Sequence, residues 1–138
     1  MEKEIKILLV EDLEEHVLII RCILEGSKQR NRVFVMRDGE EALDFLYNRG
    51  KYASKEEYPK PDVILLDLRL PKLDGIEVLE RIKSEEELKD IPVIVLTVSE
   101  RDEDRTYASE RGVKSYIVKS AFAVEKKELL DAILSLTR

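Results

Sequence analysis

Residues 62–67 read Asp-Val-Ile-Leu-Leu-Asp, an apolar run that stops at a carboxylate. A continuous apolar run of this kind is typical of a strand that is covered on both faces of a parallel sheet. Four more apolar runs are each followed by charged or hydroxyl residues: Ile5–Val10 by Glu11 and Asp12, Val33–Met36 by Arg37 and Asp38, Val93–Leu96 by Thr97, and Tyr116–Val118 by Lys119. If all five runs are parallel strands, the residues that follow them share one edge of the sheet.

The segments between the runs have apolar residues at helical spacing, which predicts five helices over 12–26, 39–49, 74–84, 100–111 and 123–136. Strict alternation of strands and helices favours a parallel sheet with helices on both faces, and right-handed crossovers leave few topologies. We predict a flavodoxin-like (βα)5 three-layer sandwich with strand order 2-1-3-4-5. In this order the first and third strands meet at the switch point, where ligands of such sheets bind.

Three local predictions concern the faces of the helices, and a fourth concerns one long connection. Leu13 lies at helical spacing from Val17, so we expect it on the buried face of the first helix, with His16 on the exposed face. We expect Cys22 to be a buried or half-buried hydrophobe. The charges of 100–111, which include Asp104 and Arg105, are expected to form a solvated face, and the polar segment 50–61 is expected to be a loop.

Composition limits the classes of protein and partner. Charged residues make up 39% of the chain, against about 25% on average, and the net charge is −6. A negative net charge argues against direct binding of nucleic acid, whose phosphates need clustered Lys and Arg. One cysteine allows no internal disulfide, and neither a signal peptide nor a run of the ~20 apolar residues of a membrane span is present. We therefore expect a cytoplasmic protein without a membrane partner.

The carboxylates at the predicted switch point favour a divalent cation. Glu11, Asp12 and Asp67 would repel one another if they were brought together without a cation. Mg²⁺ prefers oxygen ligands and usually keeps several waters. Asp12 and Asp67 would supply direct oxygens and Glu11 would act through a water molecule, with a backbone carbonyl just after Asp67 as a further ligand.

A carboxylate beside such a cation also serves as a nucleophile toward phosphoryl groups. Attack by Asp67 on a phosphoryl donor would place developing charge on the equatorial oxygens of the transferred group. The cation would neutralise one oxygen, the Lys119 ammonium another, and the Thr97 hydroxyl would donate a hydrogen bond to a third. Each of these side chains has the chemical type that its role requires.

Plainer interpretations exist for each residue taken alone. An aspartate after a strand is most often a turn former or a helix cap, and Asp12 and Asp74 both precede predicted helices. Thr97 has good strand propensity, and a lone lysine is usually solvated. The conjunction of five suitable residues at four strand ends favours a functional site.

These residues resemble the receiver domain of bacterial and archaeal two-component response regulators over essentially the whole chain. The motifs that carry the resemblance are Glu11–Asp12, the stretch Asp67-Leu-Arg-Leu-Pro-Lys-Leu-Asp-Gly75, and Thr97 and Lys119 after their strands. The resemblance implies phosphorylation of Asp67 and a Mg²⁺ site made of Glu11, Asp12, Asp67 and the backbone carbonyl of Arg69. It further implies that Thr97 and Tyr116 are switch residues and that Lys119 binds the phosphoryl group.

The resemblance also implies how the protein takes part in signalling. Residues 1–138 are expected to form a single receiver domain without an output domain, which is phosphorylated by a sensor histidine kinase or a histidine phosphotransfer protein. Such a domain is not a conventional enzyme, although it catalyses its own phosphorylation and dephosphorylation. It acts on a downstream protein through the surface of the fourth helix, fifth strand and fifth helix, and a homodimer is compatible with the family. The loop 50–61 and the segment 37–43 resemble the small regulators that partner bacterial phytochromes and related kinases.

Two departures from the family keep alternatives open. Ser120 follows Lys119 where most receivers have proline, commonly after a cis bond; we expect a trans bond here. Val98 stands where a small residue is usual. One alternative is therefore a degenerate receiver that binds its partners without phosphorylation. Another is a phosphatase or phosphotransferase of the haloacid-dehalogenase type, but the second acid of that class is replaced by Arg69.

Overall fold

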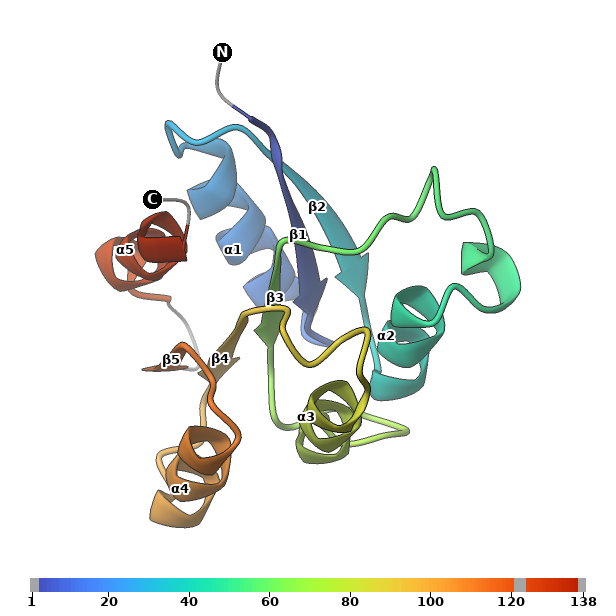
Figure 1. The fold of residues 1–138 in the computed structure, drawn as a ribbon. Coiled ribbons are helices and arrows are strands. Elements are labelled where there is room, and N and C mark those ends of the chain that lie inside the picture. Colours follow the sequence, from blue (N-terminus) through green and yellow to red (C-terminus); the bar gives the residue numbers. More distant parts are fainter. Residues whose placement is uncertain (1–2, 121–123, 137–138) are drawn as a thin grey trace.

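A computed structural model describes residues 3–120 and 124–136 (Figure 1). Within these residues the strands form one parallel sheet of order β2-β1-β3-β4-β5. The strands are β1 (Ile5–Val10), β2 (Asn31–Met36), β3 (Val63–Leu66), β4 (Val93–Thr97) and β5 (Ser115–Val118). The helices are α1 (Glu14–Glu25), α2 (Gly39–Leu46), α3 (Gly75–Ser84), α4 (Asp102–Glu110) and α5 (Lys126–Leu136), with a short 3₁₀ turn, η1 (Gly50–Tyr52).

The predicted flavodoxin-like architecture is confirmed, with one apolar layer on each face of the sheet. Alternate residues of β1 face opposite sides, because successive side chains of a strand point in opposite directions. Leu8 and Val10 pack in the layer beneath α2, α3 and α4, whereas Ile7 and Leu9 pack with α1 and α5. Figure 1 shows the corresponding division of the helices between the two sides of the sheet.

The predicted buried face of α1 is wrong at three residues. Leu13 precedes the helix with an extended backbone and is 46% exposed, so its side chain does not continue the buried stripe. His16 takes that place and is 2% exposed. Cys22 is exposed rather than buried, since it lies about 200° around the helix from Ile20.

The long connection 47–62 is anchored rather than free. Tyr52 and Tyr58 pack edge-on against each other and against Phe45, and Phe34 of β2 lies beside them. The Tyr52 hydroxyl donates a 2.7 Å hydrogen bond to Glu41 of α2. Aromatic packing and this hydrogen bond hold the segment against the α2 side of the sheet, although its sequence shows no periodicity.

Some predicted boundaries differ from the structure by a few residues. α2 ends at Leu46 rather than at Arg49, and α4 spans fewer residues than 100–111. The predicted start of the last helix at Ala123 lies outside the described residues, and α5 is seen from Lys126. No cis peptide bond occurs among the described residues, which include Lys119 and Ser120, as expected for a bond before serine. None of the described helices is both long and apolar enough to cross a membrane.

Candidate functional site at the carboxyl edge of the sheet

The three predicted metal-binding carboxylates lie together at the carboxyl ends of β1 and β3. Oxygens of Glu11, Asp12 and Asp67 are all within 4.8 Å of one another. β1 and β3 are neighbours, with Val10 beside Leu66, so the residues that follow these two strands meet. Glu11 and Asp67 are buried and Asp12 is exposed, which gives the cluster an open side toward solvent.

Lys119 is the cation of this cluster. Its side chain is fully buried at the end of β5, and its ammonium contacts Glu11 Oε1 and lies 3.3 Å from Asp67 Oδ2. A buried ammonium needs such partners, because a charge without them is costly to remove from water. The lysine therefore compensates two of the three carboxylates that the sequence brings to this edge.

Both carboxylates that Lys119 contacts are also fixed by backbone hydrogen bonds. Glu11 Oε2 accepts from the Leu13 N–H at 3.2 Å, and Asp67 Oδ1 accepts from the Arg69 N–H at 3.0 Å. Burial raises the pKa of Glu11 above its ordinary value, the hydrogen bond from Lys119 opposes this shift, and the nearby Asp67 charge adds to it. The site is thus held in place before any ligand binds.

The capping interpretation of the acidic residues is not supported. α1 is preceded by Leu13 and α3 by Asp74, and neither position makes a side-chain capping hydrogen bond. By contrast, Asp38 caps α2 by accepting from the Glu41 N–H at 2.8 Å. Asp12 lies one residue before the cap position of α1, and its exposed carboxylate belongs to the acidic cluster.

Thr97 and Tyr116 lie where the sequence predicts, but they contact Ser99 rather than the carboxylates. Thr97 ends β4 and is buried, and its hydroxyl accepts from the Ser99 N–H at 3.3 Å. Tyr116 is half-buried in β5 and donates to the Ser99 carbonyl at 3.1 Å. Arg105 of α4 lies over the Tyr116 ring at 4.7 Å.

Three residues at or near this edge were missed or misplaced by the sequence. His16 Nδ1 lies 3.8 Å from Glu11 Oε1 on the buried side of α1. Asp104, predicted to be solvated, is buried and accepts from Arg69 and from the Ser99 hydroxyl. Only the spacing of Ser99, two residues after Thr97, gave a signal of its proximity to the site.

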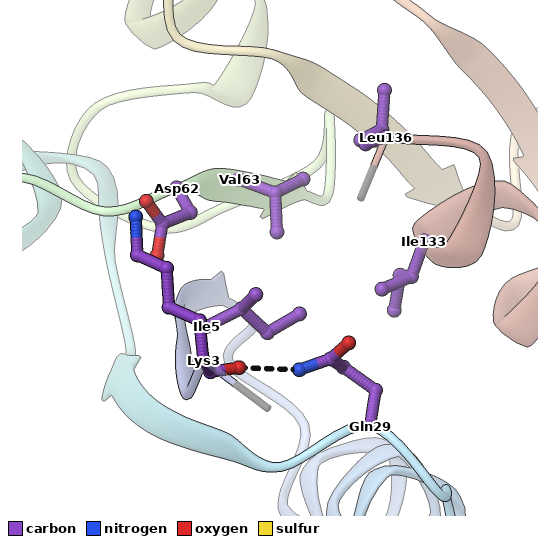
Figure 2. A pocket seen from close by; sticks show the side chains of 7 residues that line it. All are labelled: Lys3, Ile5, Gln29, Asp62, Val63, Ile133 and Leu136. Carbon is purple, nitrogen blue, oxygen red and sulfur yellow. Dashed lines mark hydrogen bonds between the residues drawn. The ribbon is translucent and has the colours of Figure 1, made fainter. Parts of the chain in front are cut away.

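A separate hollow of about 390 Å³ lies at the opposite edge of the sheet (Figure 2). Ile5 and Val63, the first residues of β1 and β3, form part of its wall, and Lys3 accepts a hydrogen bond from Gln29 beside it. The strands run away from this hollow toward the carboxylates, so the two places lie at opposite ends of β1 and β3.

The fold and these side chains define a class of α/β protein with an acidic cluster at the switch point, faced by a buried lysine. The family model of the response regulator receiver domain matches residues 7–134, and the chain belongs to this family. As a receiver domain it takes part in two-component phosphorelay signalling, and the haloacid-dehalogenase alternative is set aside.

Several relatives are similar over most of the chain. Response regulator Rcp1 from Synechocystis is 43% identical over 83% of this chain and 76% of its own length. The structure of Mn²⁺-bound Rcp1 has a TM-score of 0.81 and 39% sequence identity, and the match covers 96% of this chain and 91% of that one. The bacteriophytochrome response regulator RtBRR is 43% identical, with a TM-score of 0.85 over 99% of this chain and 80% of that one. The probable methanogenesis regulatory protein FilR2 from Methanothrix harundinacea is 41% identical over 92% of this chain and 79% of its own. The predicted resemblance to regulators associated with phytochromes is confirmed.

Proposed function

We propose that Asp67 is the phosphoacceptor of this receiver domain. The observation that carries the proposal is the meeting of three carboxylates within 4.8 Å with the Lys119 ammonium, which lies 3.3 Å from Asp67. A histidine kinase or histidine phosphotransfer protein is the donor. An Asp67 oxygen forms a bond to phosphorus while the bond from phosphorus to the donor nitrogen breaks, and the donor imidazole leaves with that electron pair.

The donor set fits a hard divalent cation, for which we propose Mg²⁺. Carboxylates of Glu11, Asp12 and Asp67 and the backbone carbonyl of Arg69 would hold it, and oxygen ligands of this kind suit Mg²⁺. The similar Rcp1 has been crystallised with Mn²⁺, which supports a divalent cation in this family member too. When bound, the cation neutralises charge on the phosphoryl oxygens.

The buried side chains around Asp67 bind and orient the phosphoryl group. Lys119 exchanges part of its contact with Asp67 for a phosphoryl oxygen, and Thr97 turns its hydroxyl from the Ser99 N–H toward another. These exchanges bias the domain between two arrangements, and Tyr116 changes its surroundings because it shares Ser99 with Thr97. The protein signals through the changed surface to a downstream protein, as a single receiver domain over residues 1–138 that also catalyses loss of its own phosphoryl group.

The proposal is tested by the mass of the intact protein after incubation with acetyl phosphate, with and without Mg²⁺. We expect one phosphoryl adduct on the wild type that requires Mg²⁺ and is lost in Asp67→Ala, while Asp62→Ala at the other end of β3 keeps it. Repeated turnover without an adduct would indicate an enzyme. If the protein forms no adduct and binds no Mg²⁺, the result would indicate an interaction module that works without phosphorylation. Ser120 would then be the first suspected cause.

Val98 is expected to slow loss of the phosphoryl group. It follows Thr97 and is 46% exposed. We propose that its branched side chain hinders a water molecule that approaches phosphorylated Asp67. Val98→Ala should shorten the half-life of phosphorylated protein about threefold, which corresponds to about 0.7 kcal/mol in the barrier. The decay is followed by intact mass after removal of acetyl phosphate, with Leu18→Ala, another exposed apolar residue, as the control. An unchanged half-life in Val98→Ala would contradict this role.

A further inference from the structure

Helix α4 is attached to the domain mainly by polar contacts. Ala108 is its only fully buried apolar residue among those described. Near its carboxyl end, Glu80 of α3 accepts from the Tyr107 hydroxyl at 2.6 Å and from Arg111 Nε at 2.7 Å. Near its amino end, the attachment is made by Asp104. Polar attachments of this kind can exchange partners, which makes the position of the helix dependent on them.

Asp104 is a buried carboxylate that joins two loops of the phosphorylation site. It is 6% exposed, and its Oδ2 accepts from Arg69 Nη2 and from Ser99 Oγ, each at 2.5 Å. Arg69 belongs to the loop after β3 and Ser99 to the loop after β4. A charge-assisted hydrogen bond to a buried carboxylate is shorter and stronger than a neutral one, so Asp104 ties both loops to α4.

Both partners of Asp104 also contact the proposed site through their backbones. The Arg69 N–H donates to Asp67 Oδ1 at 3.0 Å, and the Ser99 N–H donates to Thr97 Oγ1 at 3.3 Å. The Ser99 carbonyl in turn accepts from Tyr116. The proposed phosphoacceptor, the switch hydroxyl and the switch tyrosine are therefore each connected to the same carboxylate on α4 through a single intermediate residue, which is either Arg69 or Ser99.

We propose that Asp104 is a positioning residue that acts through Arg69 and Ser99, holding the unphosphorylated arrangement and coupling Asp67 to α4. The inference rests on the proposed function of Asp67. A phosphoryl group adds about two negative charges beside Arg69 and draws Thr97 away from Ser99, so it competes for both partners of Asp104. Release of these partners frees the amino end of α4. Because coupling between two sites is reciprocal, loss of the Asp104 contacts makes phosphorylation easier.

The contacts of Asp104 differ from the surface ion pairs of the same helix. Arg101 and Glu103 pair at 3.1 Å, but both side chains are mostly exposed to solvent, which screens the pair. Glu103 is adjacent to Asp104 in the helix and touches neither Arg69 nor Ser99 among the described contacts. It therefore offers a control that removes the same charge from the same turn.

The test compares Asp104→Asn with wild type, Glu103→Gln and Asp104→Glu in two measurements. The first is the initial rate of labelling by acetyl phosphate with Mg²⁺, followed by intact mass. The second is hydrogen exchange of the amides of residues 102–110, without metal, with Mg²⁺ alone, and with Mg²⁺ and beryllofluoride as a phosphoryl mimic. Hydrogen exchange reports local opening of the helix, which a purely local loss of charge elsewhere on α4 does not change.

We expect Asp104→Asn to be labelled about fivefold faster, the low end of the usual range for coupling between sites. Its α4 amides should exchange, without beryllofluoride, as fast as those of the beryllofluoride-bound wild type. Glu103→Gln should match the wild type, and Asp104→Glu should recover most of the wild-type rate. If Asp104→Asn were labelled at the wild-type rate and its α4 amides exchanged at the wild-type rate, the proposal would be overturned.

The outcome for Asp104 is separable from the outcome for Asp67. If the wild type takes no phosphoryl group, the proposed function fails, and the change in α4 exchange on adding Mg²⁺ alone then decides the role of Asp104. A response in the wild type that is lost in Asp104→Asn supports the coupling. Equal responses in the two proteins, or no response in the wild type, overturn it.

Discussion

Lys119→Met is expected to lower the free energy of unfolding by about 3–5 kcal/mol at neutral pH without a divalent cation. Methionine fills a similar volume, so the change removes the ammonium with little loss of packing. Glu11 and Asp67 are then left as buried carboxylates beside Asp12, without the cation that contacts them in the wild type. Breaking a buried pair costs this much because the remaining charge loses its compensation.

The loss should depend on pH and on metal. Burial already raises the pKa of Glu11, and removal of Lys119 takes away the contact that opposes this shift. The folded variant then binds a proton that the unfolded chain releases at a lower pH, so its stability falls as the pH rises from about 4.5 through the raised pKa of Glu11. The deficit should shrink toward pH 5 and when Mn²⁺ or Mg²⁺ is added, since a cation that binds only the folded state stabilises it.

Urea denaturation of wild type, Lys119→Met and Lys127→Met at pH 5 and pH 7, with and without Mn²⁺, measures these effects. Lys127 pairs with Asp131 at 3.0 Å on the exposed face of α5, so its substitution should cost at most about 0.5 kcal/mol. A deficit in Lys119→Met that is as small as that of the control, or that ignores both pH and metal, would show that the lysine does not compensate the acidic cluster.

The sequence predicts the sheet and the acidic cluster well because both depend on local patterns. Apolar runs predict the strands, and a parallel sheet brings the residues after β1 and β3 to one edge, where Glu11, Asp12 and Asp67 are found. Lys119 reaches the same cluster from the end of β5, although β4 lies between β5 and β3. The lysine side chain is long, and its buried ammonium needs an anionic partner, so Lys119 contacts the cluster. The order of the strands alone does not predict this contact.

The contacts that the sequence misses are decided by tertiary packing. Leu13 has an apolar side chain at helical spacing, but the helix begins one residue later, so His16 fills the space beside Glu11. Asp104 lies in a run of charges without apolar periodicity, which is typical of a solvated helix face. Its burial depends on Arg69, 35 residues earlier in the chain, and no local pattern indicates a pair of that separation.

The sequence likewise cannot show how closely α3 approaches β3, whose end carries the proposed phosphoacceptor Asp67. Gly75 opens α3, and a Cβ atom built on it would lie 2.0 Å from the Asp67 carbonyl oxygen and 2.6 Å from Leu68 Cα. Both neighbours are backbone atoms of the loop that carries Asp67, so a rotamer change cannot relieve the contact. Only glycine allows this approach of the helix to the end of β3.

Gly75→Ala is therefore expected to lower the free energy of unfolding by about 3 kcal/mol, the upper end of the usual cost of overpacking. Ordinary contacts of a Cβ atom begin near 3.4 Å, so the Asp67 peptide and the start of α3 must separate by more than 1 Å. Displacement of a reacting group by about 1 Å can cost about 100-fold in rate. Labelling of Asp67 by acetyl phosphate should slow to a similar extent, even in the absence of urea, where the variant is folded.

Gly26→Ala is the matched control, because its added Cβ would meet only carbonyl oxygens at 3.6 Å and its φ of −81° suits any residue. Its stability should stay within about 1 kcal/mol of the wild type, with unchanged labelling by acetyl phosphate. If Gly75→Ala matched Gly26→Ala in both stability and labelling, α3 would have room to move away from β3 without disturbing Asp67. A variant that is destabilised but labelled at the wild-type rate would limit the role of Gly75 to packing. Lower stability together with slower labelling would tie the close contact between α3 and β3 to the position of Asp67, the proposed phosphoacceptor.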